Sequence, residues 1–229
     1  GVEAVGGRCR ERPARTLRSH PGVAVVDVDA GTVERRGETG STGETAHGTP
    51  RSSPVTPPAA VRRFPAAAYE ACRTADQSRT LHDLEALDSG SERPTAAVVA
   101  ADRGRGKSSA AGLAAGSLAA RGRDVLVTAP ERRSAEEVLE RARELLGELG
   151  HLDGHTEDDL AADTGGRVRF RLPEAAAELP GDPDAVLVDE AAAIPVRRLA
   201  AFLDADAAGF FTTVHGYEGT GRGFSVRFR

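Results

Sequence analysis

The stretch Thr95–Ser109, TAAVVAADRGRGKSS, decides how the rest of this chain is interpreted. It begins with an apolar run at 96–100, passes through two glycines, and continues into an Ala-rich segment at 110–122 with apolar residues at helical spacing. Strand, glycine-containing loop and helix are the setting in which G-x-x-x-x-G-K-[ST] predicts a nucleotide-binding loop. Backbone N–H groups of such a loop and of the helix N-terminus form a concave site for an anion.

Three residues of this loop carry specific expectations. We expect Lys107 to reach the β- and γ-phosphates of ATP, and the hydroxyl of Ser108 to bind Mg²⁺. Ala101 occupies the first motif position in place of Gly, which is harmless in extended backbone but costs roughly 1 kcal/mol or more at positive φ. The alternative is a glycine-rich turn that binds nothing. Lys107 is the only lysine in a chain whose other basic residues are Arg, which favours phosphate binding.

A second landmark is the segment 184–190, DAVLVDE, in which an apolar strand ends in two carboxylates. Ligands bind at this end of the strands in open α/β sheets. We expect Asp189 to hold Mg²⁺ through water, and Glu190 to orient or deprotonate the attacking water. The alternative is that both acids cap the following AAAIP segment, because negative charge is favoured at a helix N-terminus.

A third landmark is the segment 210–224, FFTTVHGYEGTGRGF, a strand that runs into a loop with four glycines. Arg222 in this loop is expected to reach a γ-phosphate as an arginine finger or sensor. The alternative is a glycine-rich hairpin turn in which His215 and Tyr217 are packing residues. Upstream, Gln77 has capping-box spacing from Thr74. It either caps a helix or, as in several ATPase families with this loop, reads the adenine edge.

Other segments predict further elements by their pattern. They are a hairpin of strands at 22–29 and 32–35, a strand at 124–128, a helix begun by the capping-box pair Ser134 and Glu137, a surface loop at 154–166, and an edge strand at 167–171. Together with the landmarks they predict an α/β fold of the P-loop, RecA/helicase-like class. Its sheet is expected to be mainly parallel, with helices on both faces, and to be preceded by a partial N-terminal region.

Length and composition set further bounds. The 229 residues, 39% of them hydrophobic, are enough for a buried core, and the net charge of −5 argues against a uniformly basic nucleic-acid-binding surface. No apolar run long enough to span a membrane and no signal peptide is present, so we expect a cytoplasmic protein. We divide the chain into a remnant of an N-terminal domain at 1–36, a flexible linker or loop at 37–62, and a P-loop ATPase domain at 63–229. Because the sequence contains no Met, we expect it to be a piece of a longer protein.

Three motifs together resemble a known family. ADRGRGKS at 101–108, VDEAAAIP at 188–195 and TTVHGYEGTGRGF at 212–224 are similar to the helicase-like ATPase module of the tRNA(Met) cytidine acetyltransferases. The resemblance spans about 74–229, and HGYEGTGRGF is its specific part, because phosphate loops and DE strand ends occur in many ATPases. It implies an RNA-modifying enzyme that forms N4-acetylcytidine in tRNA from acetyl-CoA, with ATP hydrolysis driving or gating the reaction. In the bacterial family the modified base is at the wobble position of elongator tRNA-Met.

The resemblance also assigns site residues. The positions that match ATP contacts of the family are Gln77, Asp102, Arg103, Gly104, Arg105, Gly106, Lys107, Ser108, Ser109 and Arg222, and Asp189 with Glu190 matches its DE motif. The acetyl-CoA-binding domain of the family follows HGYEGTGRGF, and no matching residues occur here, so we expect no acetyl transfer by this chain alone. Two alternatives stay open: one lobe of an RNA helicase or translocase, and a nucleotide-gated RNA-binding module.

Overall fold

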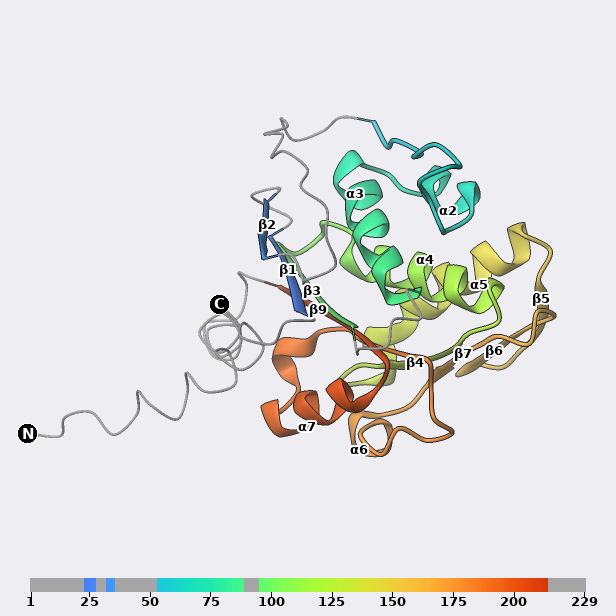
Figure 1. The fold of residues 1–229 in the computed structure, drawn as a ribbon. Coiled ribbons are helices and arrows are strands. Elements are labelled where there is room, and N and C mark those ends of the chain that lie inside the picture. Colours follow the sequence, from blue (N-terminus) through green and yellow to red (C-terminus); the bar gives the residue numbers. More distant parts are fainter. Residues whose placement is uncertain (1–22, 28–31, 36–52, 89–94, 214–229) are drawn as a thin grey trace, which may run out of the picture.

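The computed structural model describes residues 23–27, 32–35, 53–88 and 95–213 (Figure 1). They contain a nine-stranded sheet in the order β2-β1-β3-β9-β8-β4-β7-β6-β5. The strands are β1 (Val23–Asp27), β2 (Thr32–Arg35), β3 (Thr95–Ala101), β4 (Asp124–Thr128), β5 (Leu152–His155), β6 (Asp159–Ala162), β7 (Arg167–Phe170), β8 (Ala185–Val188) and β9 (Ala207–Thr213).

The six strands from β1 to β7 in this order pair in parallel, and antiparallel strands extend the sheet at both ends. The predicted mainly parallel sheet is therefore confirmed, and so is the hairpin of β1 and β2. β3, β8 and β9 are almost continuously apolar because both of their faces are covered. Since β1 pairs with β3, this hairpin lies in the same sheet as the phosphate-loop strand. The domain boundaries at residues 36 and 62 stay predictions.

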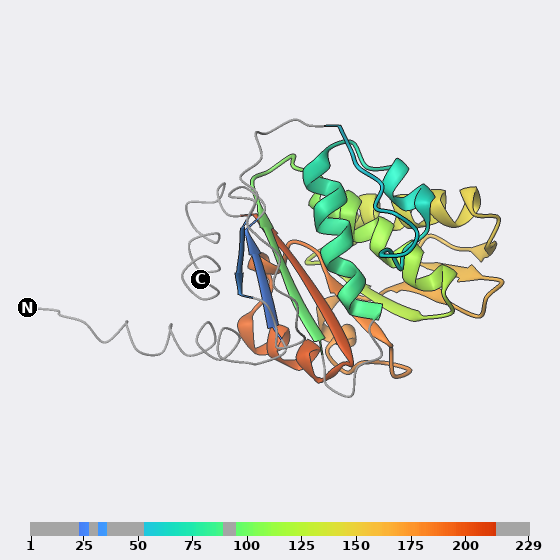
Figure 2. The ribbon, with the colours of Figure 1, turned by 45° about the horizontal axis from the view of Figure 1, so that its top comes forward.

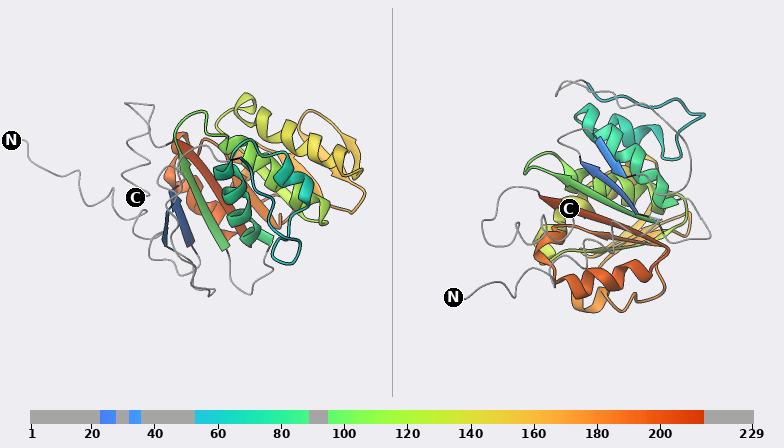
Figure 3. Two further views of the ribbon diagram at one scale, coloured as in Figure 1. Left: turned by 90° about the horizontal axis from the view of Figure 1, so that it is seen from above. Right: turned by 60° about the vertical axis from the view of Figure 1, so that its left-hand side comes forward.

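Helices cover both faces of the sheet, as predicted (Figures 1 and 3). One face carries α2 (Ala66–Glu70), α3 (Ala75–Leu84), η1 (Glu85–Asp88), α4 (Lys107–Ala120), η2 (Arg132–Ala135) and α5 (Glu136–Glu148). The other face carries α6 (Pro173–Ala176), η3 (Ala191–Ala193), α7 (Val196–Ala201) and η4 (Phe202–Asp204). Each layer encloses its own apolar cluster against the sheet, the larger one under α3, α4 and α5.

The helix that follows the phosphate loop, α4, packs closely against α5 through two glycines. A Cβ at Gly112 would lie 2.5 Å from the carbonyl oxygen of Val138 and 2.7 Å from Cβ of Arg141. A Cβ at Gly116 would lie 3.0 Å from the carbonyl oxygen of Ala142. These two positions let the backbones of α4 and α5 approach one another, and so they fix where the N-terminus of α4 lies.

We expect Gly112→Ala to destabilise the protein by about 1–3 kcal/mol, because backbone atoms of α5 cannot move aside as a side-chain end can. The matched control is Gly147→Ala in α5, where an added Cβ meets nothing within 4 Å. The free energy of unfolding of that variant should instead rise by roughly 0.5–1 kcal/mol, because Ala has a better helix propensity than Gly. Urea unfolding of both variants measures the difference, and equal stabilities would show that the α4–α5 contact is not tight.

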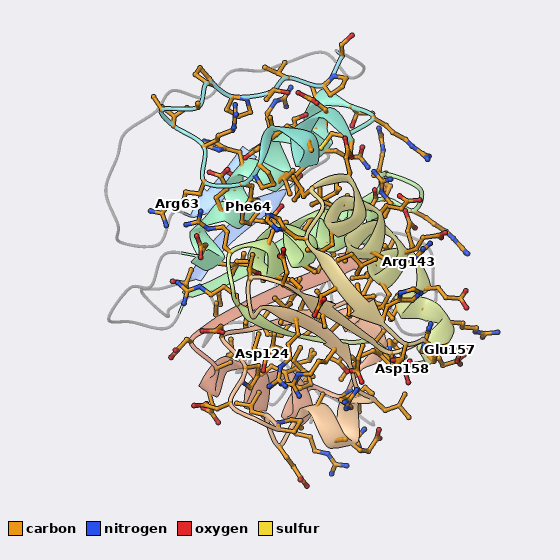
Figure 4. The ribbon with its side chains drawn as sticks, turned by 90° about the vertical axis from the view of Figure 1, so that its right-hand side faces the viewer. Arg63, Phe64, Asp124, Arg143, Glu157 and Asp158 are labelled. Carbon is orange, nitrogen blue, oxygen red and sulfur yellow. The ribbon has the colours of Figure 1, made fainter. Side chains whose placement is uncertain are left out.

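The edge of the sheet at which β4 begins is closed by ion pairs. Asp124 Oδ1 accepts from Nε of Arg169 at 2.8 Å, and Oδ2 accepts from the guanidinium groups of Arg169 at 2.7 Å and Arg167 at 2.6 Å. Asp184 accepts from the backbone N–H of Asp124 at 2.7 Å. In Figure 4 Asp124 and Asp158 lie toward opposite ends of the strands. Asp124 and Asp184 thus have their hydrogen-bond partners at the end of the sheet where β4 begins. The candidate site lies at the opposite end, where the parallel strands end.

Three predictions about local structure are wrong. The polar segment 154–166 is not a loop throughout: it contains the end of β5 and the whole of β6, which form an antiparallel pair at the edge of the sheet, with Leu160 and Ala162 of β6 buried. Consequently β7 is an interior strand, paired with β4 and β6, and not an edge strand. The Ser134–Glu137 capping box does not form either: α5 begins after Ala135 without a side-chain cap.

Candidate nucleotide site

The predicted phosphate loop and the predicted carboxylates meet at one edge of the sheet. β3 and β8 run in parallel with β9 between them, so their C-terminal ends point the same way. Figure 2 shows β3 (green) and β9 (red) side by side. The loop after β3 leads directly into α4, and Asp189 and Glu190 follow β8.

The backbone of the loop has the conformation that its glycines allow. Gly104 and Gly106 have φ of 79° and 78°, in the left-handed region that disfavours other residues. Ala101 belongs to strand β3, so the replacement of the first motif glycine carries no conformational cost. Gly106 is the N-cap of α4, and no side chain caps the helix there. The N-terminus of α4, with its positive dipole end, therefore faces this loop without a side-chain cap at Gly106, a setting that suits an anion.

Lys107 lies across the base of this loop. Its Nζ donates to the carbonyl oxygens of Ala101 at 2.7 Å and Asp102 at 2.8 Å. The ammonium is thus held at the point where the loop folds back on the strand, close to Asp189, whose pKa it lowers. The only lysine of the chain is thus the residue of the phosphate loop whose charge acts on Asp189 of the second landmark.

Gln77 braces the loop from α3. Its backbone N–H donates to Oγ1 of Thr74 at 3.2 Å, which confirms the predicted helix cap. The side-chain Oε1 accepts from the backbone N–H of Arg73 at 2.7 Å, and Nε2 donates to the carbonyl oxygen of Gly106 at 3.3 Å. A Cβ at Gly106 would lie only 1.8 Å from Nε2, so this contact also requires glycine. Reading of the adenine by Gln77 stays a prediction.

Asp189 is buried, only 3% exposed, at the end of β8. Its Oδ1 accepts from the backbone N–H of Glu190 at 2.9 Å, while Oδ2 has no hydrogen-bond partner among the described residues. Burial raises the pKa of this carboxyl from 3.8 to about 6, because an ionised group is costly away from water. The Ser108 side chain, the N–H of Glu190 and the charge of Lys107 lower this pKa in part, and the charge of Glu190 raises it.

This raised pKa predicts how stability depends on pH. Folding favours the protonated carboxyl of Asp189. The stability that this group contributes to the folded state is therefore fully present below pH 4 and is lost as the pH rises through about 6. Without nucleotide or Mg²⁺, Asp189→Asn should therefore be more stable than the wild type by about 2–3 kcal/mol at pH 8, and nearly equal to it at pH 4. Urea unfolding at both values tests this, with exposed Asp153→Asn as control. A difference that does not change with pH would contradict it.

Glu190 has an unusual backbone and a long-range partner. Its φ of 47° and ψ of 40° are in the left-handed region, and its side chain does not cap η3. The carboxylate oxygen Oε2 instead accepts from Oγ of Ser134 at 2.9 Å. The alternative role of Glu190 as a cap is thus not observed. The contact with Ser134 was missed because that residue was assigned to a helix cap.

The remaining predicted residues are divided between the loop and the undescribed part of the chain. The side chains of Arg103 and Arg105 are exposed on the loop, which Asp102 begins. Ser109 turns its hydroxyl away toward α5, where Oγ accepts from Nε of Arg141 at 3.2 Å. Arg222, with His215 and Tyr217, lies outside the described residues. Its predicted role stays a prediction.

Comparison with known proteins identifies relatives of this chain. Residues 98–229 match the model of the family described as RNA cytidine acetyltransferase NAT10/TcmA, helicase domain. A protein of Haloferax volcanii named tRNA(Met) cytidine acetyltransferase TmcA is 57% identical over the whole chain, which covers 30% of that protein. Proteins of the same name from Haloarcula marismortui and Pyrococcus abyssi are 53% and 34% identical over 100% and 99% of the chain, which covers 29% and 28% of their lengths. The chain thus spans under a third of these relatives.

A solved structure with some likeness is the ATPase domain of the large terminase of Thermus phage P74-26. It has a TM-score of 0.41 and 20% identity over 59% of this chain and 70% of that one, a likeness too low to bear on fold or function. Within the described residues, none of the helices combines the length and the apolar character that crossing a bilayer requires.

Proposed function

Because the chain belongs to the NAT10/TcmA RNA cytidine acetyltransferase helicase-domain family, we propose that it is the ATP-binding and ATP-hydrolysing module of an enzyme that forms N4-acetylcytidine in tRNA. The proposed acetyl donor is acetyl-CoA, and the proposed target is the wobble cytidine of elongator tRNA-Met. One observation supports the proposed ATP binding and hydrolysis: the loop of Lys107 and the buried carboxyl of Asp189 lie close together at the C-terminal ends of the strands.

Binding of the triphosphate follows from the loop. N–H groups at the N-terminus of α4 contact phosphate oxygens, and the dipole of this 14-residue helix adds a favourable potential. Lys107 exchanges its two carbonyl partners for phosphate oxygens and neutralises part of their charge. Gln77 keeps Gly106 in place and contributes to adenine recognition, while Arg103 and Arg105 border the phosphates from the solvent side.

The side chains at this site provide oxygen ligands suitable for a magnesium ion. Mg²⁺ prefers oxygen ligands and is commonly held by one or two protein groups together with substrate phosphates and water. The hydroxyl of Ser108 and the unpartnered Oδ2 of Asp189 supply such ligands, Asp189 through water. Among the described residues no group of three or more His, Cys, Asp or Glu could hold a metal, so the phosphates complete the site. When bound, the ion neutralises charge that develops on the phosphate oxygens.

Hydrolysis requires one further group, which Glu190 supplies. Its carboxylate takes a proton from water as the water oxygen bonds to the γ-phosphorus, and the bond to the β-phosphate oxygen breaks to release ADP and phosphate. Arg222 stabilises the charge on the departing γ-phosphoryl group through its guanidinium fork. The same module, coupled to acetyl transfer elsewhere in the protein, drives or gates modification of the RNA.

The full-length protein tests this proposal directly. Incubated with tRNA-Met and acetyl-CoA, it should form N4-acetylcytidine with ATP but not with a non-hydrolysable ATP analogue, as measured by mass spectrometry of nucleosides. A reaction without acetyl-CoA is the control. Equal yields with ATP, with the analogue and without nucleotide would contradict a role of hydrolysis. No acetylcytidine under any condition would contradict the proposed reaction.

A further inference from the structure

Ser134 and Glu190 are 56 residues apart in sequence and meet at the candidate site. β4 and β8 are parallel neighbours in which Thr128 pairs with Val188, so the segments after both strands leave the same sheet edge. The segment after β4 forms η2, and it directs the hydroxyl of Ser134 to Oε2 of Glu190 at 2.9 Å. The fold itself therefore produces this contact.

The segment that carries Ser134 is held in place by its neighbours. Arg132 donates from Nε to Oδ1 of Asp158 at 2.6 Å and from Nη2 to the carbonyl oxygen of Glu157 at 2.5 Å. Both acceptors lie in the turn between β5 and β6, where Figure 4 shows them next to each other. The guanidinium also lies over the ring of Phe170, 5.9 Å from its centre. Ser134 is consequently a donor on a braced segment.

Glu190 is held from its other side as well. Its backbone N–H donates to Oδ1 of Asp189 at 2.9 Å, and its left-handed backbone turns the chain sharply after β8. With the main chain fixed, the remaining freedom of the carboxylate is in its side-chain torsions. One hydrogen bond to Oε2 selects among these torsions and leaves the other acceptor positions for a water molecule.

We propose that Ser134 is a positioning residue that holds the Glu190 carboxylate for its role in ATP hydrolysis. This inference rests on the proposed function of Glu190 as the group that takes the proton from water. A small displacement of a reacting group lowers the reaction rate far more than it lowers the affinity for the substrate. Ser134 should therefore act on turnover and not on nucleotide binding.

Three serine variants of the full-length protein test the proposal. Ser134→Ala should lower kcat for ATP hydrolysis about tenfold, with KM and the affinity for a fluorescent ATP analogue within about twofold of wild type. Ser134→Thr keeps the hydroxyl and should recover most of the rate. The control is Ser117→Ala on α4, which removes a hydroxyl bound to the carbonyl oxygen of Leu113 and should leave the rate unchanged. An unchanged or raised kcat in Ser134→Ala, or an equal loss of affinity, would overturn the proposal.

A second readout needs no activity. In nucleotide-free protein, Ser134→Ala should lower the urea midpoint in the wild-type background but not in a Glu190→Ala background, because the hydrogen bond is already absent there. Additive effects would show that the two side chains do not interact. If the wild-type protein does not hydrolyse ATP, the proposed function fails and this inference fails with it. If the wild type hydrolyses ATP and Ser134→Ala does so equally well, only the positioning role is wrong.

Discussion

Glu190→Gln is expected to slow ATP hydrolysis by about 100- to 10,000-fold, the usual range for loss of a general base. The amide has nearly the same shape as the carboxylate and still accepts a hydrogen bond from Ser134, but it cannot take a proton from water. Nucleotide binding should remain close to that of the wild type, since Lys107, Ser108 and Asp189 are unchanged. Phosphate release under saturating ATP measures the first effect, and titration with a fluorescent ATP analogue the second.

The matched control for this variant is Glu178→Gln. Glu178 is exposed and follows α6, away from the phosphate loop, so the same chemical change there should leave the rate unaltered. If Glu190→Gln hydrolysed ATP at the wild-type rate, Glu190 would not be the base. The left-handed backbone at this position would then serve only the turn after β8.

Lys107→Ala is expected to weaken ATP binding by about 100-fold or more. Charge-assisted hydrogen bonds each contribute about 1.5–3 kcal/mol, and the variant loses the only lysine at the phosphate site. Lys107→Arg should not restore affinity, because a planar guanidinium does not fit the point between the carbonyl groups of Ala101 and Asp102. Equilibrium titration with an ATP analogue measures the loss, and urea unfolding confirms that the variant is folded.

The control for charge is Arg143→Ala on the exposed side of α5 (Figure 4). It removes one positive charge from the same domain and should leave the affinity for ATP within about twofold, since exposed charges at a distance are screened by salt. Wild-type affinity in Lys107→Ala would exclude the loop as the phosphate site.

Elements with a local signal were predictable from the sequence. β3 with its loop and α4, and β4 and β8, occur where apolar runs, glycines and helical spacing placed them. The Thr74–Gln77 cap is also local and was predicted correctly. Strands at the centre of a parallel sheet are strongly apolar, so their pattern is hard to mistake. The same clarity made Asp189 predictable as a strand-end carboxylate.

Contacts between residues that are far apart in the sequence could not be predicted in the same way. Ser134 has the residue type and spacing of a helix cap, but its hydroxyl is used by Glu190, which only the pairing of β4 with β8 brings near. Likewise, nothing local shows that Gly112 is needed for the approach of α5. β5 and β6 were missed because an edge pair buries few side chains and its polar composition is typical of a loop.

We propose that Lys107 and Asp189 face a nucleoside triphosphate between the ends of β3 and β8. A crystal structure of the protein with Mg²⁺ and a non-hydrolysable ATP analogue tests it most directly. We predict that Nζ of Lys107 leaves the carbonyl oxygens of Ala101 and Asp102 for phosphate oxygens, and that Ser108 and, through water, Asp189 would hold the ion. A nucleotide bound elsewhere, with Lys107 still on both carbonyl groups, would contradict the account.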